Sequence, residues 1–361
     1  MMEDNNMNFQ SSENILLTGA GFTKNFGGLL ASEMWAEIFN HEKIQAQTRI
    51  KELMSDDFDY ESIYYNIIEG SYTNDEKEAI DDAVKFAYEY IDSILRQFII
   101  NHPYPLELSI VNDLVSKFSE TGSYSYIGTN NVTHYVFPET SIKSFIFTLN
   151  QDLFFERLYP SHADAKLSIP GIKNNSNWFT THFNKPLNRE DYCQLPEEEE
   201  LNRNADLLSD GNFFLIKLHG SYNWRSFDGS DIMVIGRGKY EQIQKEPLLK
   251  YYFEIFENVL SQNERRLLII GYGFSDKHIN RIISKAVKDK GLKIYIISPD
   301  SPEEFKKKLC EKSGLGINIW QEISGYFQYS LKEIIFSKNT GKNTAIKQHF
   351  YDVFWASLNK I

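Results

Sequence analysis

The chain has 361 residues and a net charge of −12, and 42% of its residues are hydrophobic. This apolar content supports a sizeable core and excludes a mainly disordered chain, while the length fits two domains or one large domain with insertions. No run of about 18 apolar residues predicts a membrane span, and two cysteines exclude a disulfide framework and a four-cysteine zinc site.

The charges form no basic patch of the kind that nucleic-acid-binding proteins present. The densest basic stretch, Lys306-Lys307-Lys308, is short and follows two glutamates, as on a solvated helix face. Residues 1–14 carry no basic run followed by an apolar block, so no secretory signal is expected. We therefore expect a cytoplasmic protein without direct nucleic-acid or membrane partners.

The first half of the chain begins with an apolar strand over 14–18 that stops at a glycine-rich turn. Apolar residues at steps of three and four predict helices over 29–53 and 80–98. A further helix is expected over 106–118, and residues 121–141 are typical of a loop or hairpin.

The second half alternates apolar strands with helices and loops. Residues 156–211 lack a sustained period and indicate a loop-rich insertion, and the aromatic tail after residue 300 looks helical. The strands are expected over 142–149, 213–218, 232–235, 266–270 and 293–297, and the helices over 247–260 and 279–287.

Strands that alternate with helices are typical of a parallel, doubly wound sheet. We predict an α/β fold of the Rossmann-like type, with a helical insertion and a helical C-terminal tail. The core domain covers 14–300 and is interrupted by a mainly helical insertion over 31–140 and by the loop-rich stretch 156–211. Residues 301–361 form the C-terminal extension.

Two of the predicted strands end at glycine-rich turns. The first, Gly19 to Thr23, allows close backbone approach and precedes a helix start that would favour a phosphate. It lacks the third glycine of the dinucleotide fingerprint, because Lys24 stands there, and a tight turn without a ligand explains it equally well. The second turn, Gly271 to Ser275, ends the strand over 266–270, and Ser275 or Asp276 could cap the helix that follows it. Two glycine turns on one sheet suit a ligand with two phosphates.

Polar side chains follow two other strands. Asn150 could hold a hydroxyl or a water, and Asp152 could orient a neighbour or cap a helix. His219 stands at the mouth of the sheet beside a glycine and suits general base catalysis, although a single histidine is more often structural. Ligands of doubly wound sheets bind outside the carboxyl ends of the strands, where all these clusters lie.

In chain order these clusters resemble the motifs of the sirtuin family. The chain is more similar to the divergent bacterial branch of NAD-consuming defence proteins, in which a Gly-Tyr-Gly-Phe-Ser-Asp turn and a His-Gly-Ser motif also occur. The motifs that carry the likeness are Gly19-Ala20-Gly21, Thr148-Leu149-Asn150-Gln151-Asp152, Leu218-His219-Gly220-Ser221 and Gly271-Tyr272-Gly273.

The resemblance implies an NAD site. Asn150 would hold the nicotinamide ribose and the attacking water, Asp152 would support that geometry, and His219 would be the general base. No metal would be needed, because nicotinamide is already a cationic leaving group. The residues that would contact NAD are Gly19, Ala20, Gly21, Phe22 and Thr23 at the pyrophosphate, Thr148, and Gly271, Tyr272, Gly273, Phe274, Ser275 and Ser298, with the last six at the adenosine half.

Two departures from the protein-deacylating sirtuins change the expected reaction. No cysteine lies between His219 and Cys310, so the four-cysteine zinc module is absent, and Asn25-Phe26-Gly27-Gly28 replaces the acidic-Phe-Arg segment. Water becomes the default nucleophile, which implies hydrolysis of NAD to ADP-ribose and nicotinamide, with cyclisation as a variant. A protein deacylase and a non-catalytic NAD or ADP-ribose-binding scaffold are the alternatives.

An unrestrained NAD hydrolase would be toxic to its own cell, so control is expected. The likeness to the defence branch implies an effector of bacterial anti-phage defence that acts by NAD depletion, or abortive infection. It further implies a homo-oligomer or a partner such as a HerA-type DNA-translocating ATPase.

Overall fold

The computed structural model divides the chain into two compact units. The first comprises residues 1–26, 102–147 and 255–361, and the second comprises 27–101 and 148–254. The structure describes residues 9–101, 124–127, 133–136, 142–158, 167–172, 185–203, 207–209, 211, 213–312 and 316–331.

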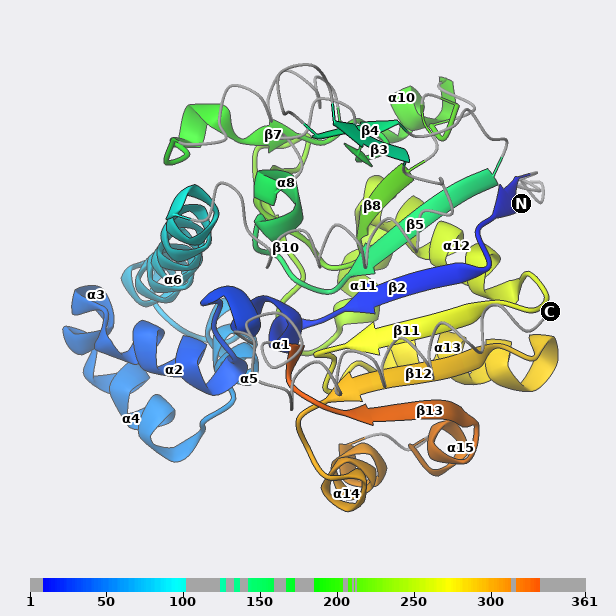
Figure 1. Cartoon of the computed structure of the whole chain (residues 1–361). Helices are drawn as coiled ribbons and strands as arrows, with labels where there is room; N and C mark the ends of the chain where they lie inside the picture. Colours follow the sequence, from blue (N-terminus) through cyan, green and yellow to red (C-terminus); the bar gives the residue numbers. More distant parts are fainter. Residues whose placement is uncertain are drawn as a thin grey trace. The chain divides into compact units, whose positions relative to one another are not determined.

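A parallel sheet is the centre of the first unit. Its strands lie in the order β13-β12-β11-β2-β5, and β1 pairs with β5. Ile270 lies opposite both Thr18 and Ile297, so β2, β11 and β12 end side by side and their arrows point the same way (Figure 1). The strands are β1 (Gln10–Ser11), β2 (Asn14–Thr18), β5 (Ile142–Thr148), β11 (Arg266–Ile270), β12 (Lys293–Ser298) and β13 (Ile323–Gln328).

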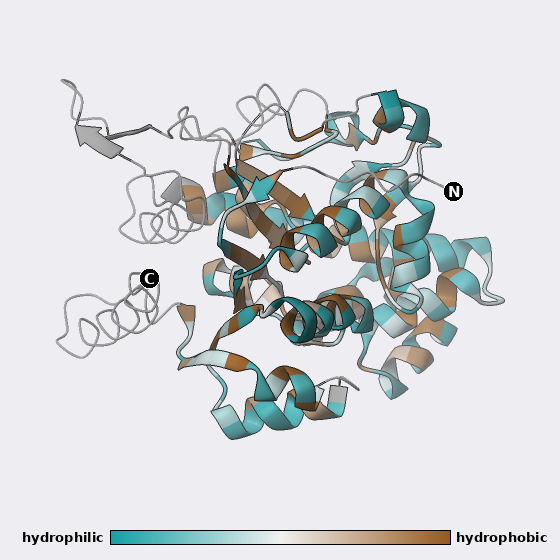
Figure 2. Cartoon of the chain, turned by 90° about the vertical axis from the view of Figure 1, so that its right-hand side faces the viewer, coloured by the Kyte–Doolittle hydropathy of each residue, from teal (hydrophilic) through white to brown (hydrophobic). Residues whose placement is uncertain are grey.

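The central strands β2 and β11 are buried along their whole length, as expected where helices cover both faces of a sheet. Figure 2 shows how the hydrophobic residues gather on the strands. Helix α13 buries one face, with Ile279, Ile282 and Ile283 at helical spacing, and ends at Gly291. The helices of this unit are α1 (Ala20–Thr23), η1 (Lys24–Phe26), α13 (Lys277–Lys290), α14 (Pro302–Lys312) and α15 (Gly316–Gln321).

The predicted α/β, Rossmann-like fold is confirmed, with a correction in the tail. Residues 323–328 were predicted within a helical extension but form β13, which pairs in parallel with β12. Its aromatic and β-branched residues favour a strand, and β12 would otherwise leave an unpaired edge. The predicted helix over 106–118 and the tail from 332 lie outside the described residues. Within 121–141, β3 (Tyr124–Ile127) and β4 (Thr133–Val136) form an antiparallel hairpin.

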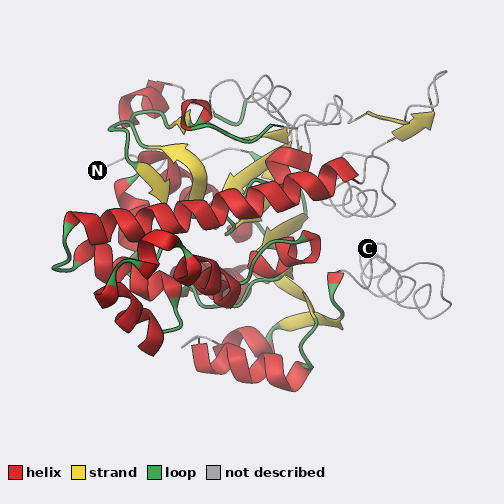
Figure 3. Cartoon of the chain, turned by 90° about the vertical axis from the view of Figure 1, so that its left-hand side faces the viewer, coloured by secondary structure: helices red, strands yellow, loops and turns green. Residues whose placement is uncertain are grey.

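Helices make up the N-terminal part of the second unit. The helix predicted over 29–53 is divided into three, whereas α6 is a single helix of 28 residues (Figure 3). Thr73 and Glu76 cap its start reciprocally, with the Glu76 carboxylate accepting from the Thr73 amide at 2.8 Å. The helices are α2 (Ala31–Asn40), α3 (Glu42–Gln45), α4 (Thr48–Asp56), α5 (Tyr60–Glu69) and α6 (Asn74–Asn101).

Short strands and helices make up the rest of the second unit. β8 pairs in parallel with β6, and β9 pairs antiparallel with β10 and parallel with β7. None of the helices in the described ranges has the length and apolar composition needed to cross a bilayer. The elements are α8 (Phe154–Leu158), β6 (Leu167–Ser168), η3 (Arg189–Asp191), β7 (Cys193–Gln194), α10 (Glu198–Arg203), β8 (Phe213–Lys217), β9 (Gly220–Arg225), β10 (Asp231–Met233), α11 (Lys239–Lys245) and α12 (Pro247–Ser261), the last of which continues into the first unit.

Candidate functional site

The two glycine turns of the first unit pack directly on each other. The amide of Gly19 donates to the carbonyl of Ile270 at 3.1 Å, and the amide of Gly21 donates to that of Gly271 at 3.0 Å. A Cβ on Gly271, whose φ is +69°, would lie 2.1 Å from the Phe22 nitrogen, and one on Gly21 would lie 2.7 Å from the Gly271 Cα. The contact between the turns therefore requires glycine at these positions.

The other predicted binding residues of this unit divide into buried and exposed ones. Phe22, Tyr272 and Phe274 are buried and contribute to the core, whereas Ala20, Gly273 and Ser275 are exposed at the turns. The contact of these six residues with a ligand stays a prediction. Thr23 is buried as well, and the Ser298 hydroxyl accepts a hydrogen bond from the Asp300 amide at 3.3 Å.

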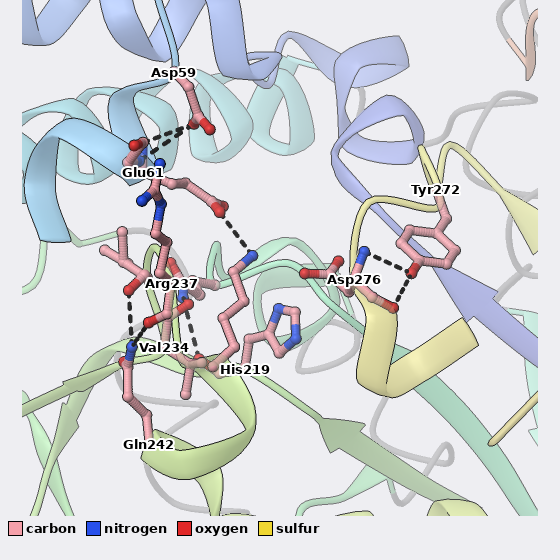
Figure 4. A network of polar contacts seen from close by, with 12 residues as sticks. Asp59, Glu61, His219, Val234, Arg237, Gln242, Tyr272 and Asp276 are labelled. Carbon is pink, nitrogen blue, oxygen red and sulfur yellow. Dashed lines mark hydrogen bonds and ion pairs between the residues drawn. The ribbon is translucent and has the colours of Figure 1, made fainter. Parts of the chain in front are cut away.

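The second glycine turn is anchored to α13 by Tyr272 and Asn280. The Tyr272 hydroxyl donates to the Asn280 side-chain oxygen at 2.9 Å. It accepts from the Asp276 amide at 3.3 Å (Figure 4). Burial raises the pKa of Tyr272 well above its ordinary value, so the hydroxyl stays a donor. Asp276 is the N-cap residue of α13 by position, without a side-chain capping bond.

In the second unit, the segment 148–152 is joined by hydrogen bonds to the segment 218–222. The Leu218 amide donates to the Thr148 carbonyl at 2.9 Å, and the Tyr222 amide donates to the Gln151 carbonyl at 3.1 Å. Asn150 and His219 are both buried, and His219 is only 3% exposed. Two of the predicted catalytic residues therefore lie on adjoining segments that are bonded to each other.

Gln151, which belongs to the predicted motif but was assigned no role from the sequence, makes the side-chain link between these segments. Its Nε2 donates to the carbonyls of His219 at 3.1 Å and Val234 at 3.0 Å, and its Oε1 accepts from the Tyr88 hydroxyl at 2.5 Å. The His219 carbonyl also accepts from the Val234 amide at 3.0 Å (Figure 4). The turn that carries His219 is thus held from two sides.

Asp152 caps the helix that follows it. Its Oδ1 accepts from the Phe154 amide at 3.0 Å, which agrees with the capping interpretation. Its backbone carbonyl accepts from the Lys217 ammonium, which also binds Glu156 Oε1 at 2.6 Å. Lys217 is 0% and Glu156 3% exposed, and burial raises the pKa of Glu156 while Lys217 opposes the shift.

A second buried ion pair holds the same helix. Arg157 Nε donates to Asp92 Oδ1 at 2.8 Å, and its Nη2 donates to Oδ2 at 2.6 Å, so the contact is bidentate. α8 is therefore anchored to β8 through Glu156 and to α6 through Arg157. Sequence patterns missed both pairs because the partners are far apart in the chain.

A family model described as the SIR2-like domain matches residues 144–317. The chain therefore contains a SIR2-like domain. No curated protein matches the chain. SIR2-like domains are often NAD-dependent enzymes, so the match points to an NAD-related activity in general.

The matched SIR2-like domain includes Asn150, His219 and the Gly271 turn, whereas the turn at Gly19 precedes it. The structure brings the predicted residues together in two groups. Gly19 to Thr23, Gly271 to Ser275 and Ser298 belong to the first unit, and Thr148, Asn150, Asp152 and His219 belong to the second.

Proposed function

We propose that the chain is an NAD hydrolase that releases nicotinamide and ADP-ribose. The observation that carries the proposal is the bonding of the Asn150 segment to the His219 turn within a SIR2-like domain.

The reaction needs an oriented water and a base. The glycosidic bond between the nicotinamide nitrogen and the ribose carbon breaks, and its electron pair leaves with nicotinamide. Water then bonds to the ribose carbon of an oxocarbenium-like state and passes a proton to the His219 imidazole. Asn150 orients the water, because its carboxamide offers both a donor and an acceptor.

Water is the proposed acceptor because the chain lacks the features that a deacylase uses. No cysteine lies between His219 and Cys310, so the zinc module of the protein-deacylating sirtuins has no counterpart. A deacylase would release nicotinamide only with an acylated peptide, whereas a hydrolase releases it from NAD alone. A non-catalytic scaffold would bind NAD or ADP-ribose without release.

The test is nicotinamide release by the purified chain without peptide. We expect His219→Ala to lower the turnover by about 10²- to 10⁴-fold. The matched control is His41→Ala, in which a histidine of the same unit that lies against the Phe86 ring is removed. A His219→Ala variant that folds and retains full turnover, or a wild type that needs an acylated peptide, contradicts the proposal.

The proposal extends to the biological role. The chain acts as an effector of anti-phage defence through NAD depletion, as a homo-oligomer or with a HerA-type ATPase. Light scattering of the purified chain tests the homo-oligomer, and co-purification of the two co-expressed proteins tests the ATPase. In infected cells, NAD should fall with the wild type and not with His219→Ala.

A further inference from the structure

Buried hydroxyl and amide groups connect helix α6 of the second unit to the His219 turn. The Tyr88 hydroxyl of α6 donates to Gln151 Oε1 at 2.5 Å. Gln151 then donates to the carbonyl of His219.

Every polar atom of the Gln151 side chain is used in this chain of bonds. Tyr88 is 7% and Gln151 5% exposed, so no bulk water replaces a lost partner. The orientation of the amide is fixed, because Nε2 faces two carbonyl oxygens, of His219 and Val234, and only a nitrogen can donate to them. Loss of one bond therefore leaves a buried group unpaired.

We propose that Tyr88 and Gln151 are positioning residues through which helix α6 fixes the backbone of the His219 turn and thereby sets the rate of nicotinamide release. The inference rests on the proposed function. Gln151 also stands between Asn150 and Asp152, and its carbonyl accepts from the Tyr222 amide, so one residue holds both segments. A shift of the Gln151 amide moves the turn relative to the Asn150 segment.

The Tyr88 hydroxyl can be removed without removing the ring. The ring stacks on Tyr222, with centroids 6.0 Å apart and planes inclined by 8°, and phenylalanine keeps this contact. Tyr64→Phe is the matched control, because the Tyr64 hydroxyl of α5 donates to Asp81 of α6 at 3.2 Å and not to Gln151. Each variant loses one tyrosine hydroxyl bond that involves α6, and only Tyr88→Phe loses the bond to Gln151.

The first measurement is steady-state nicotinamide release. We expect Tyr88→Phe to lower kcat by about tenfold with a smaller change in KM, because the base is misplaced while binding contacts persist. In a Gln151→Met background, Tyr88→Phe should cause no further loss, since its effect passes through Gln151. Tyr64→Phe should keep kcat. Additive losses in the double variant, or equal losses in Tyr88→Phe and Tyr64→Phe, overturn the inference.

Amide hydrogen exchange provides a readout that needs no activity. The Val234 amide donates to the His219 carbonyl, so its protection reports the position of the turn. We expect exchange at Val234 about tenfold faster in Tyr88→Phe than in the wild type, and unchanged in Tyr64→Phe. Unchanged exchange in Tyr88→Phe refutes the positioning role. If the wild type releases no nicotinamide, only the proposed function is refuted. The hydrogen-exchange result still decides whether Tyr88 positions the His219 turn.

Discussion

The contact between the two glycine turns predicts that Gly271 and Gly291 respond differently to the same substitution. Both residues have φ of +69°, a conformation that alanine adopts at a cost. A Cβ at Gly271 would lie 2.1 Å from the Phe22 nitrogen and 2.3 Å from the Gly21 carbonyl carbon, whereas a Cβ at Gly291 meets nothing within 4 Å. Gly291→Ala therefore isolates the conformational cost, and Gly271→Ala adds the collision.

The magnitudes follow from these two contributions. The left-handed conformation costs alanine about 1 kcal/mol, which is the loss expected for Gly291→Ala. At Gly271 the collision is with backbone atoms that cannot rotate away, and overpacking of this kind costs a further ~1–3 kcal/mol. The expected total for Gly271→Ala is thus about 2–4 kcal/mol. Because the unfolded chain gains the same alanine in both variants, effects on the unfolded state cancel in the comparison.

Urea unfolding followed by circular dichroism measures the difference. Gly271→Ala should unfold at a clearly lower urea concentration than Gly291→Ala, with the wild type highest. Equal losses in the two variants would refute the close approach of the turns. If glycine were needed in the Gly19 and Gly271 turns only for ligand binding, Gly271→Ala would lose NAD binding without this extra loss of stability.

Two further predictions concern the segment around Asp152. Lys217→Met should cost about 3–5 kcal/mol, because it leaves the Glu156 carboxyl buried without its cation. The loss of the cation should also raise the pKa of Glu156 further. A carboxyl whose pKa is raised in the folded state makes the protein less stable as the pH rises through that pKa. The unfolding midpoint of Lys217→Met should therefore fall further below that of the wild type at pH 8 than at pH 5. A loss of stability that does not depend on pH contradicts the role of Glu156. A pH dependence that persists when Glu156→Gln is added to Lys217→Met also contradicts it. Asp152→Ala should lose about 1 kcal/mol and Asp152→Ser much less, because serine also caps a helix. If Asp152 acts through this cap, Asp152→Ser should keep most of the nicotinamide release. Equal losses of release in Asp152→Ser and Asp152→Ala would instead show that the reaction needs the carboxylate of Asp152.

Five strands, β2, β5, β8, β11 and β12, and the places where they end could be predicted from the sequence. Short apolar runs such as residues 14–18 and 266–270 leave few alternatives to a buried strand, and parallel strands place their carboxyl ends at one edge. The glycine turns could be located for the same reason. Their contact with each other could not, because it depends on the pairing of β2 with β11, which are separated by most of the chain.

The contacts that hold the predicted site residues in place could not be predicted from the sequence. Tyr88 and Gln151 are 63 positions apart, and a tyrosine at helical spacing on α6 is indistinguishable from an ordinary core residue. Lys217 ends an apolar strand and looks like the exposed charge that closes such a strand, yet it is fully buried against Glu156. β13 was missed because its six residues follow two helices, α14 and α15, and have no strong alternation of their own.

The central claim is that this chain cleaves NAD with Asn150 and His219. The most direct measurement is nicotinamide release from NAD by the purified chain, beside Asn150→Ala and His219→Ala, with His41→Ala and Asn258→Ala as controls of the same residue types. The account predicts release by the wild type and both controls, and a loss of about 10²-fold or more in the two site variants. Release that survives in the folded Asn150→Ala and His219→Ala variants, or a wild type that neither binds nor cleaves NAD, would contradict it.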